Sequence, residues 1–300
     1  MIMVKYFKFL LLCLIWGTTF AAIKIGSAST PPMLGLALRY CFALVILFAA
    51  ILITRRKIPV DRSSLKIYAI VGIYSMGLSY LCTYWGMQYI PSGLSALLWA
   101  TLPLCTGIFA NFMVPSEKLN ARHLFSIILA ILGVTRIISD WQLVLNMQVL
   151  IGCLVVLAGV VLAAYPNVYL KARDNGYDSL VLTAMAILIG AVIHTTGALL
   201  TGQFQRMTWS LVNIGSAAYL GAFGSAVAFI IYYSLLQKIE VVKLSFVTFI
   251  SPIVAVLVGL IVLKETITLN EVIGVGLIFG GLFLYDYRKY AAFLKFSRTA

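Results

Sequence analysis

Apolar residues run along this chain in long stretches that short polar segments separate. Each stretch is close to the roughly 20 residues that an α-helix needs to cross the hydrocarbon core of a bilayer. None alternates apolar and polar positions in the way of a transmembrane β-strand. The pattern predicts an all-α integral membrane protein with ten transmembrane helices. They cover residues 6–26, 33–54, 66–88, 92–114, 123–139, 148–170, 179–200, 211–236, 243–263 and 270–287.

Composition excludes a soluble domain. Hydrophobic residues make up 62% of the 300 residues, charged residues make up 10%, and the mean hydropathy is +1.04. A soluble domain carries roughly 25% charged residues, which cover its surface. This chain has too few polar side chains for such a surface, and its polar segments are too short for an extramembrane domain.

The basic residues predict the orientation. The net charge of +13 does not indicate a nucleic-acid partner, because the basic residues lie in short segments between apolar stretches. With the N-terminus in the cytoplasm, 17 lysines and arginines fall in cytoplasmic segments. Four fall outside, namely Lys24, Arg136, Arg206 and Lys264. The positive-inside rule therefore places both termini in the cytoplasm of a protein of the cell (inner) membrane. Lys24 interrupts the end of the first stretch, which argues against a cleaved signal peptide.

The five cysteines form neither a metal-binding pattern nor a disulfide framework. They all lie inside apolar stretches, at positions 13, 41, 82, 105 and 153. Small apolar packing residues are the simplest interpretation. We expect no cofactor and no metal. The expected partners are the lipid bilayer and a small-molecule substrate, and the protein is expected to be a monomer or a homodimer.

The chain contains an internal repeat. Residues 89–103 and 238–252 each run from a loop into a helix with a proline at the same offset. After Pro103, 14 residues lead to Glu117, and after Pro252, 13 residues lead to Glu265. From each glutamate, 16 residues lead to a glycine inside an apolar helix. The chain thus divides into two five-helix halves, 1–140 and 147–290, and a cytoplasmic tail, 291–300. Because five is odd, the second half would be inverted, an architecture that many secondary transporters share.

Several motifs resemble one known family in their order, spacing and duplication. They are LIWGTTFAAIKIG (14–26), LALRY (36–40), GLSALLWATLPLCTGIFANFMVPSEKL (93–119), YLGAFGSAVAFIIYYSLLQKI (219–239) and LSFVTFISPIVAVLVGLIVLKETITLNEVIGVGLIFGGL (244–282). Together they resemble the EamA branch of the drug/metabolite transporter superfamily over nearly the whole chain. The first half departs from the family at VPSE (114–117), where a glycine usually precedes the glutamate, and the sixth helix matches loosely.

The resemblance implies a function. It implies a secondary transporter with alternating access, most often an exporter of amino acids or similar small amphipathic metabolites. Efflux of drugs or toxic compounds, and uptake of metabolites, are the alternatives. An integral-membrane enzyme is disfavoured, because the chain has two histidines and all nine acidic residues lie in loops or near helix ends. The same absence argues against coupling through a buried carboxylate.

The resemblance also implies that helices 1, 3, 4, 8 and 9 line a central cavity. Aromatic and hydroxyl residues lie on these helices at helical spacing, and rings with one polar atom suit amphipathic ligands. Simple packing between helices would produce the same stripes. The predicted cavity residues are Trp16, Thr19, Phe20, Tyr80, Tyr84, Trp99, Phe229, Tyr232, Ser245 and Phe249.

Prolines and charged residues within the helices complete the predicted site. Pro103 and Pro252 each remove a backbone hydrogen bond, and we interpret them as hinges beside the cavity, with plain structural kinks as the alternative. Arg39 is the one deeply placed charge, and Lys24 lies one turn inside the outer end of the first helix. Both could attract carboxylate-bearing substrates, but a structural Arg39 and a snorkelling Lys24 are favoured. His194 is interpreted as a buried or interfacial residue rather than a proton sensor.

Overall fold

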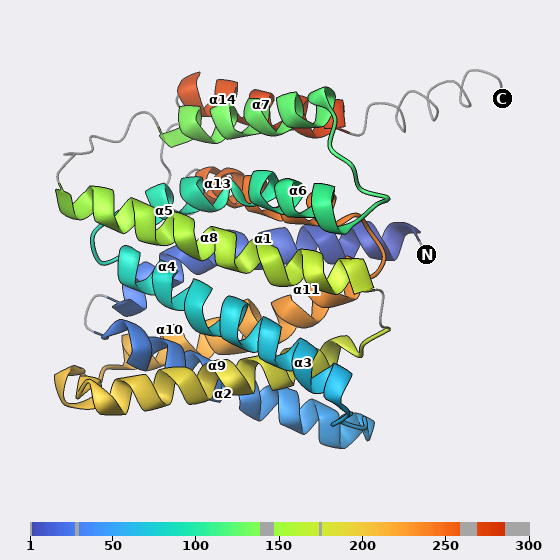
Figure 1. Ribbon diagram of the computed structural model, residues 1–300. Helices are drawn as coiled ribbons and strands as arrows, with labels where there is room; N and C mark the ends of the chain where they lie inside the picture. Colours follow the sequence, from blue (N-terminus) through green and yellow to red (C-terminus); the bar gives the residue numbers. More distant parts are fainter. Residues whose placement is uncertain (1, 28–29, 139–146, 174–175, 259–268, 286–300) are drawn as a thin grey trace.

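The computed structural model describes residues 2–27, 30–138, 147–173, 176–258 and 269–285 (Figure 1). Every regular element in these ranges is helical, which confirms the all-α prediction. The elements are α1 (Ile2–Ser27), α2 (Pro32–Thr54), α3 (Arg62–Ile70), η1 (Val71–Ser79), α4 (Tyr80–Gly86), α5 (Ser92–Trp99), α6 (Leu102–Met113), α7 (Ala121–Ile138), α8 (Met147–Arg173), α9 (Ser179–Leu200), η2 (Gln203–Arg206), α10 (Leu211–Tyr219), η3 (Leu220–Val227), α11 (Ala228–Leu236), α12 (Val241–Ser245), α13 (Val247–Val258) and α14 (Leu269–Tyr285).

Seven helical segments within the described residues are long and apolar enough to cross a membrane. They are Val4–Gly26, Pro32–Thr54, Arg62–Gly86, Leu94–Met113, Met147–Arg173, Ser179–Leu200 and Leu211–Leu236. The three other predicted spans are helical but shorter or broken, as α7, α12–α13 and α14. Residues 259–263 of the predicted ninth span and 286–287 of the tenth lie outside the described residues. The chain is a multi-pass membrane protein.

Local sequence accounts for several helix ends. Asp61 accepts hydrogen bonds from the backbone N–H groups of Ser63 and Ser64, at 3.0 and 3.1 Å, at the start of α3. Asp178 does the same for Leu180 and Val181 at the start of α9. These carboxylates satisfy backbone donors that a first helical turn leaves free. Arg55 ends α2 in the left-handed conformation, with φ of 50°.

Charged side chains join the helix ends at one face of the bundle, which we call the basic face. Lys5 donates to the carbonyl of Lys238 at 3.2 Å, and Lys171 donates to that of Leu236 at 3.1 Å. Arg56 and Asp178 form an ion pair at 3.2 Å. In Figure 1 this face is on the right, where α1 begins and α2 ends. The described segments that these contacts join, all predicted to be cytoplasmic, therefore lie together. The side of the membrane on which they lie stays a prediction.

Two of the spans contain a π-helical segment. Within Arg62–Gly86 it is η1, and within Leu211–Leu236 it is η3. Both segments pack closely on neighbouring helices through glycine. A Cβ atom at Gly72 would lie 2.7 Å from Ile189 of α9, and one at Gly221 would lie 2.5 Å from the Arg39 carbonyl oxygen of α2. Short π segments occur often at functional sites, and the apolar pattern gave no signal for them.

Two other spans are broken near their predicted hinges. The first break separates α5 from α6 at Ala100 and Thr101, so Pro103 occupies the first turn of α6, where its missing N–H costs no hydrogen bond. The second separates α12 from α13 at Phe246, and Pro252 lies within α13. At the first break the Leu98 carbonyl accepts both the backbone N–H of Thr101, at 3.1 Å, and its hydroxyl, at 2.6 Å.

Candidate functional site

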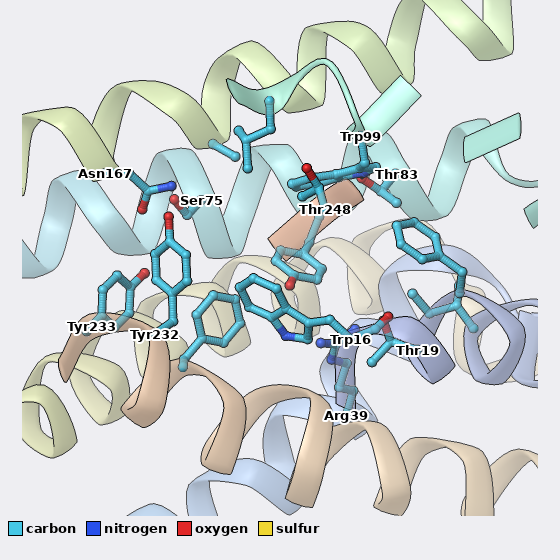
Figure 2. Close-up of a pocket in the computed structure, with 16 residues that line it drawn as sticks. Trp16, Thr19, Arg39, Ser75, Thr83, Trp99, Asn167, Tyr232, Tyr233 and Thr248 are labelled. Carbon is cyan, nitrogen blue, oxygen red and sulfur yellow. The ribbon is translucent and has the colours of Figure 1, made fainter. Parts of the chain in front are cut away.

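A cavity lies in the centre of the bundle, between the two π-containing spans and the two broken ones (Figure 2). The space free of protein atoms in the cavity and its open mouth is about 700 Å³. Its lining consists of Trp16, Thr19, Phe20, Ile23, Arg39, Ser75, Tyr80, Thr83, Trp99, Leu102, Ala163, Asn167, Phe229, Tyr232, Tyr233 and Thr248.

Aromatic rings form most of the wall. Trp16 of α1 packs against Phe229 and Tyr232 of α11, with ring centroids 5.5 and 5.3 Å apart. Tyr80 lies 6.0 Å from Phe229 and 6.4 Å from Trp99. These separations are typical of edge-to-face and tilted aromatic pairs. The rings form one continuous surface on which an apolar or aromatic ligand could pack.

Both tryptophans of the cavity wall, Trp16 and Trp99, donate a hydrogen bond from the indole N–H to another residue of the protein. Trp99 donates to the Thr83 hydroxyl at 3.1 Å, and Trp16 donates to the Gly224 carbonyl at 3.4 Å. Each bond fixes the orientation of a ring that lines the cavity. The first joins α5 to α4, and the second joins α1 to η3, so the wall is held by elements from distant parts of the sequence.

Arg39 is the charged residue of the cavity wall, and its side chain is 1% exposed. Its Nε donates to the Ser225 hydroxyl at 2.7 Å and its Nη2 to the Gly224 carbonyl at 3.1 Å. Its Nη1 has a longer contact of 3.4 Å with the Tyr84 hydroxyl. The guanidinium also lies over the Tyr80 ring, 4.7 Å from its centroid. Arg39 thus ties α2 to both π-containing spans.

The other end of the cavity, toward the basic face, is polar but uncharged. Asn167, Ser75, Tyr232 and Tyr233 gather there, away from Arg39 (Figure 2). Asn167 comes four residues before Lys171, and Tyr232 four before Leu236, the two residues joined at the basic face. The Tyr232 hydroxyl is buried and has no hydrogen-bond partner among the described residues. A buried hydroxyl of this kind is costly unless something bonds to it.

The structure brings together seven of the ten predicted cavity residues. Trp16, Thr19, Phe20, Tyr80, Trp99, Phe229 and Tyr232 line the cavity. Ser245 and Phe249 do not. Ser245 is fully buried and its hydroxyl donates to the Val242 carbonyl at 2.6 Å, while Phe249 packs on Phe246 with centroids 5.3 Å apart. Because the helix breaks at Phe246, the stripe expected along the whole ninth span is divided between two helices.

Tyr84 lies outside the central cavity, and Lys24, in the last turn of α1, bonds to a neighbouring helix end. Tyr84 turns toward Arg39 and lines a smaller neighbouring cavity, near Thr30 and Asn213. Lys24 donates to the carbonyl oxygens of Met87 and Ile90, at 2.9 and 3.4 Å, where α4 ends. These carbonyls would otherwise have no partner within the helix. Lys24 therefore supports the turn between α4 and α5 and does not line the central cavity.

Five polar residues of the lining are absent from the predicted list, namely Ser75, Thr83, Asn167, Tyr233 and Thr248. Asn167 lies in α8, the helix that matched the known family only loosely. Ser75 lies in η1 and Tyr233 follows Tyr232 on α11. An amide in an otherwise apolar membrane helix is itself a signal of function, and it could have identified Asn167. The position of Ser75 depends on the π segment, which the sequence did not predict.

His194 is buried and lies outside the central cavity. One ring nitrogen, Nε2, is 3.0 Å from the Met76 carbonyl oxygen, and the ring packs against Tyr40 at 5.7 Å. Both neighbours belong to helices packed on α9. The geometry agrees with the interpretation of a structural histidine.

Comparison with known proteins identifies the family to which the chain belongs. The sequence profile of the EamA-like transporter family matches the chain twice, at residues 3–139 and 150–285. The chain belongs to the EamA-like transporter family. It is a membrane transporter.

Relatives extend over almost the whole chain. It is 29% identical over 276 residues to the "Uncharacterized transporter YoaV" of Bacillus subtilis, covering 91% of this chain and 94% of that one. It is 27% identical over 281 residues to the "Uncharacterized inner membrane transporter YedA" of Escherichia coli, covering 93% and 89%. A solved crystal structure shares the fold, with a TM-score of 0.78 at 18% identity over 94% of this chain and 96% of that one.

Proposed function

We propose that this protein is a secondary transporter that carries small amphipathic metabolites, amino acids among them, out of the cell by alternating access. The observation that supports it most is the central cavity, whose wall carries rings from α1, α4, α5 and α11 and which has one buried cation, Arg39, at one end. A site of this kind gives a ligand both apolar surface and a few fixed polar groups. Membership of a transporter family agrees with this use of the cavity.

The proposed architecture is an inverted repeat of ten helices, with halves at 1–140 and 147–290. Two findings support it. The family profile matches each half separately. The π-helical segments begin 149 residues apart, at Val71 and Leu220. The same spacing relates pairs of cavity residues, Tyr80 to Phe229 and Thr83 to Tyr232.

In the proposed cycle the cavity opens to the two faces in turn. The contacts that close the basic face are those of Lys5 and Lys171, together with the bond from the Val241 N–H to the Glu117 carboxylate at 2.8 Å. The contacts of Lys5 with Lys238 and of Glu117 with Val241 join the two halves, and that of Lys171 joins α8 to α11 within the second half. Opening toward the cytoplasm would break them, and the helix breaks near Pro103 and Pro252 would let parts of two spans tilt independently.

Counterflow into liposomes tests the function. Purified protein is reconstituted into vesicles preloaded with one unlabelled compound, and uptake of the labelled compound is followed for amino acids and other small aromatic or amphipathic metabolites. A secondary transporter should give transient accumulation that needs the internal compound. Uptake that is equally fast without it would indicate a channel, and chemical conversion of the compound would indicate an enzyme.

A further inference from the structure

Arg39 has no acidic partner among the residues that the structure describes. It is buried, and the three groups that accept its hydrogen bonds are two hydroxyls and a backbone carbonyl, from Ser225, Tyr84 and Gly224. None of the sixteen residues lining the cavity is acidic. In the part of the chain that the structure describes, the ion pairs are Arg56–Asp178 and Lys243–Glu240, neither of which involves Arg39. Buried charges in proteins are ordinarily paired.

The guanidinium has donors to spare. It carries five N–H groups in a planar fork that suits a carboxylate. Three hydrogen bonds are formed, and the one to Tyr84 is long at 3.4 Å. An anionic group entering beside Arg39 would therefore find free donors and an unbalanced positive charge in a wall made largely of rings.

The rest of the cavity offers no anionic group that could pair with a positive group of the ligand. Its far end holds Asn167, Ser75 and Tyr232, which are neutral, and the Tyr232 hydroxyl has no partner there. The repeat does not duplicate the positive charge of Arg39. In the proposed repeat α9 corresponds to α2, and α9 contains neither lysine nor arginine. The cavity is thus positive near Arg39 and neutral elsewhere.

We infer that the preferred substrates are organic monoanions with an aromatic or apolar body, bound with the carboxylate at Arg39 and the body packed against Trp16, Tyr80 and Phe229. The inference rests on the proposed transport function and narrows its substrate class. A zwitterionic amino acid would bind through its carboxylate, but its ammonium group would face only neutral oxygen atoms and rings. A purely cationic compound would be repelled by Arg39.

Four compounds that share a phenyl ring and a short chain test the charge preference. They are 3-phenylpropionate, its neutral amide 3-phenylpropanamide, zwitterionic L-phenylalanine and cationic 2-phenylethylamine. Binding to the detergent-purified protein is measured by isothermal titration calorimetry at pH 7. We expect 3-phenylpropionate to bind at least tenfold more tightly than the amide, with phenylalanine between them and the amine weakest.

Two variants assign the preference to Arg39. In Arg39→Gln the ratio of the affinities for 3-phenylpropionate and its amide should fall toward one. In Arg206→Gln, the same substitution at an exposed site in η2, it should stay as in the wild type. Both affinities are measured on the same preparation, so a fraction of unfolded protein does not change the ratio between them. Thermal unfolding of each variant checks that the fold is kept.

The outcomes separate the inference from the proposed function. Equal affinity for the acid, the amide and the amine in the wild type, or an unchanged ratio in Arg39→Gln, would overturn the inference and leave transport standing. Failure of all four compounds to bind would overturn the aromatic cavity as a substrate site and the inference with it. Counterflow of compounds unrelated to these four would then still support transport.

Discussion

Gly133 of α7 and Gly281 of α14 contact each other's helix in a reciprocal way. A Cβ atom at Gly133 would lie 2.6 Å from the Gly274 carbonyl oxygen and 2.8 Å from Ile278. One at Gly281 would lie 2.6 Å from the Ser126 carbonyl oxygen and 3.1 Å from Ala130. Each contacted residue of α14 follows its counterpart in α7 by 148 residues, the spacing of the two glycines. Such reciprocity is what a two-fold relation between the two helices requires.

Close packing at this crossing should make Gly281→Ala destabilising. The new methyl group would meet a backbone carbonyl, which cannot move without shifting the helix, so we expect a loss of about 1–3 kcal/mol. Melting of the purified protein, followed by size-exclusion fluorescence, gives the change in Tm. Gly276→Ala in the same helix is the matched control, because a Cβ atom there has nothing within 4 Å. That change should leave the Tm equal or raise it. Equal changes in Tm for Gly281→Ala and Gly276→Ala would contradict the close packing of α7 against α14.

Most of the fold could be predicted because a membrane span depends on length and apolarity. The predicted stretches 33–54, 179–200 and 211–236 coincide with helical spans to within about one residue at each end. The π segments and the break at Phe246 could not be predicted in the same way. They change the backbone without changing the apolar character of the sequence, and the hydropathy pattern contains no signal for them.

The site was predicted well where the helices are regular and poorly where they are not. Trp16 and Tyr80 lie on the cavity face that their spacing suggested. Phe249 follows the break at Phe246, so it does not share a face with residues before the break. The Tyr84 hydroxyl points toward Arg39, 45 positions earlier in the chain, and the spacing of residues along one helix carries no information about such a contact. The motif comparison identified the helices, and tertiary contacts then decided which of their residues face the cavity.

Replacing Glu117 with glutamine should destabilise the folded protein less than replacing it with alanine. Its half-buried carboxylate accepts the Val241 N–H, and burial raises its pKa above the ordinary value of 4.5. Glu117→Gln keeps an acceptor and removes the unfavourable charge. Because the pKa is raised in the folded protein, wild-type stability declines as the pH rises from 4.5 through the raised value. The Tm of Glu117→Gln relative to wild type should therefore increase between pH 4.5 and pH 8.

Glu117→Ala provides the contrast at the same position. It removes the acceptor and leaves the first backbone donor of α12 without its partner, at a cost of about 0.5–2 kcal/mol. Its Tm should be lower than that of Glu117→Gln throughout this pH range. A Glu117→Gln protein that is less stable than wild type at pH 8 would show that the carboxylate is needed in its charged form.

The orientation of the basic face can be tested with reporter fusions. A C-terminal fusion after Arg62 or Lys171 should give fluorescent protein and inactive alkaline phosphatase, since both positions are predicted to be cytoplasmic. A fusion near Trp209 should give active phosphatase. The two faces differ strongly in basic residues, so we expect an unambiguous pattern. Active phosphatase after Arg62 would invert the predicted topology.

Trp99→Ala should weaken substrate binding while leaving the protein folded. Trp99 lies between Tyr80 and the Thr83 hydroxyl in the cavity wall, and a ligand in the cavity would bury part of its ring. Burial of an apolar side chain of this size is worth roughly 1.5–3 kcal/mol, so affinity should fall about tenfold or more.

Trp209→Ala is the matched control for this loss, because Trp209 is 57% exposed and lies outside the cavity. Binding by calorimetry and the yield of monodisperse protein are compared for both variants. An unchanged affinity in a well-folded Trp99→Ala protein would mean that the substrate does not pack on this ring. The part of the cavity wall formed by α5 would then have to be rejected as a ligand contact. A tenfold loss confined to Trp99→Ala would instead place the ligand against α5, beside the helix break that precedes Pro103.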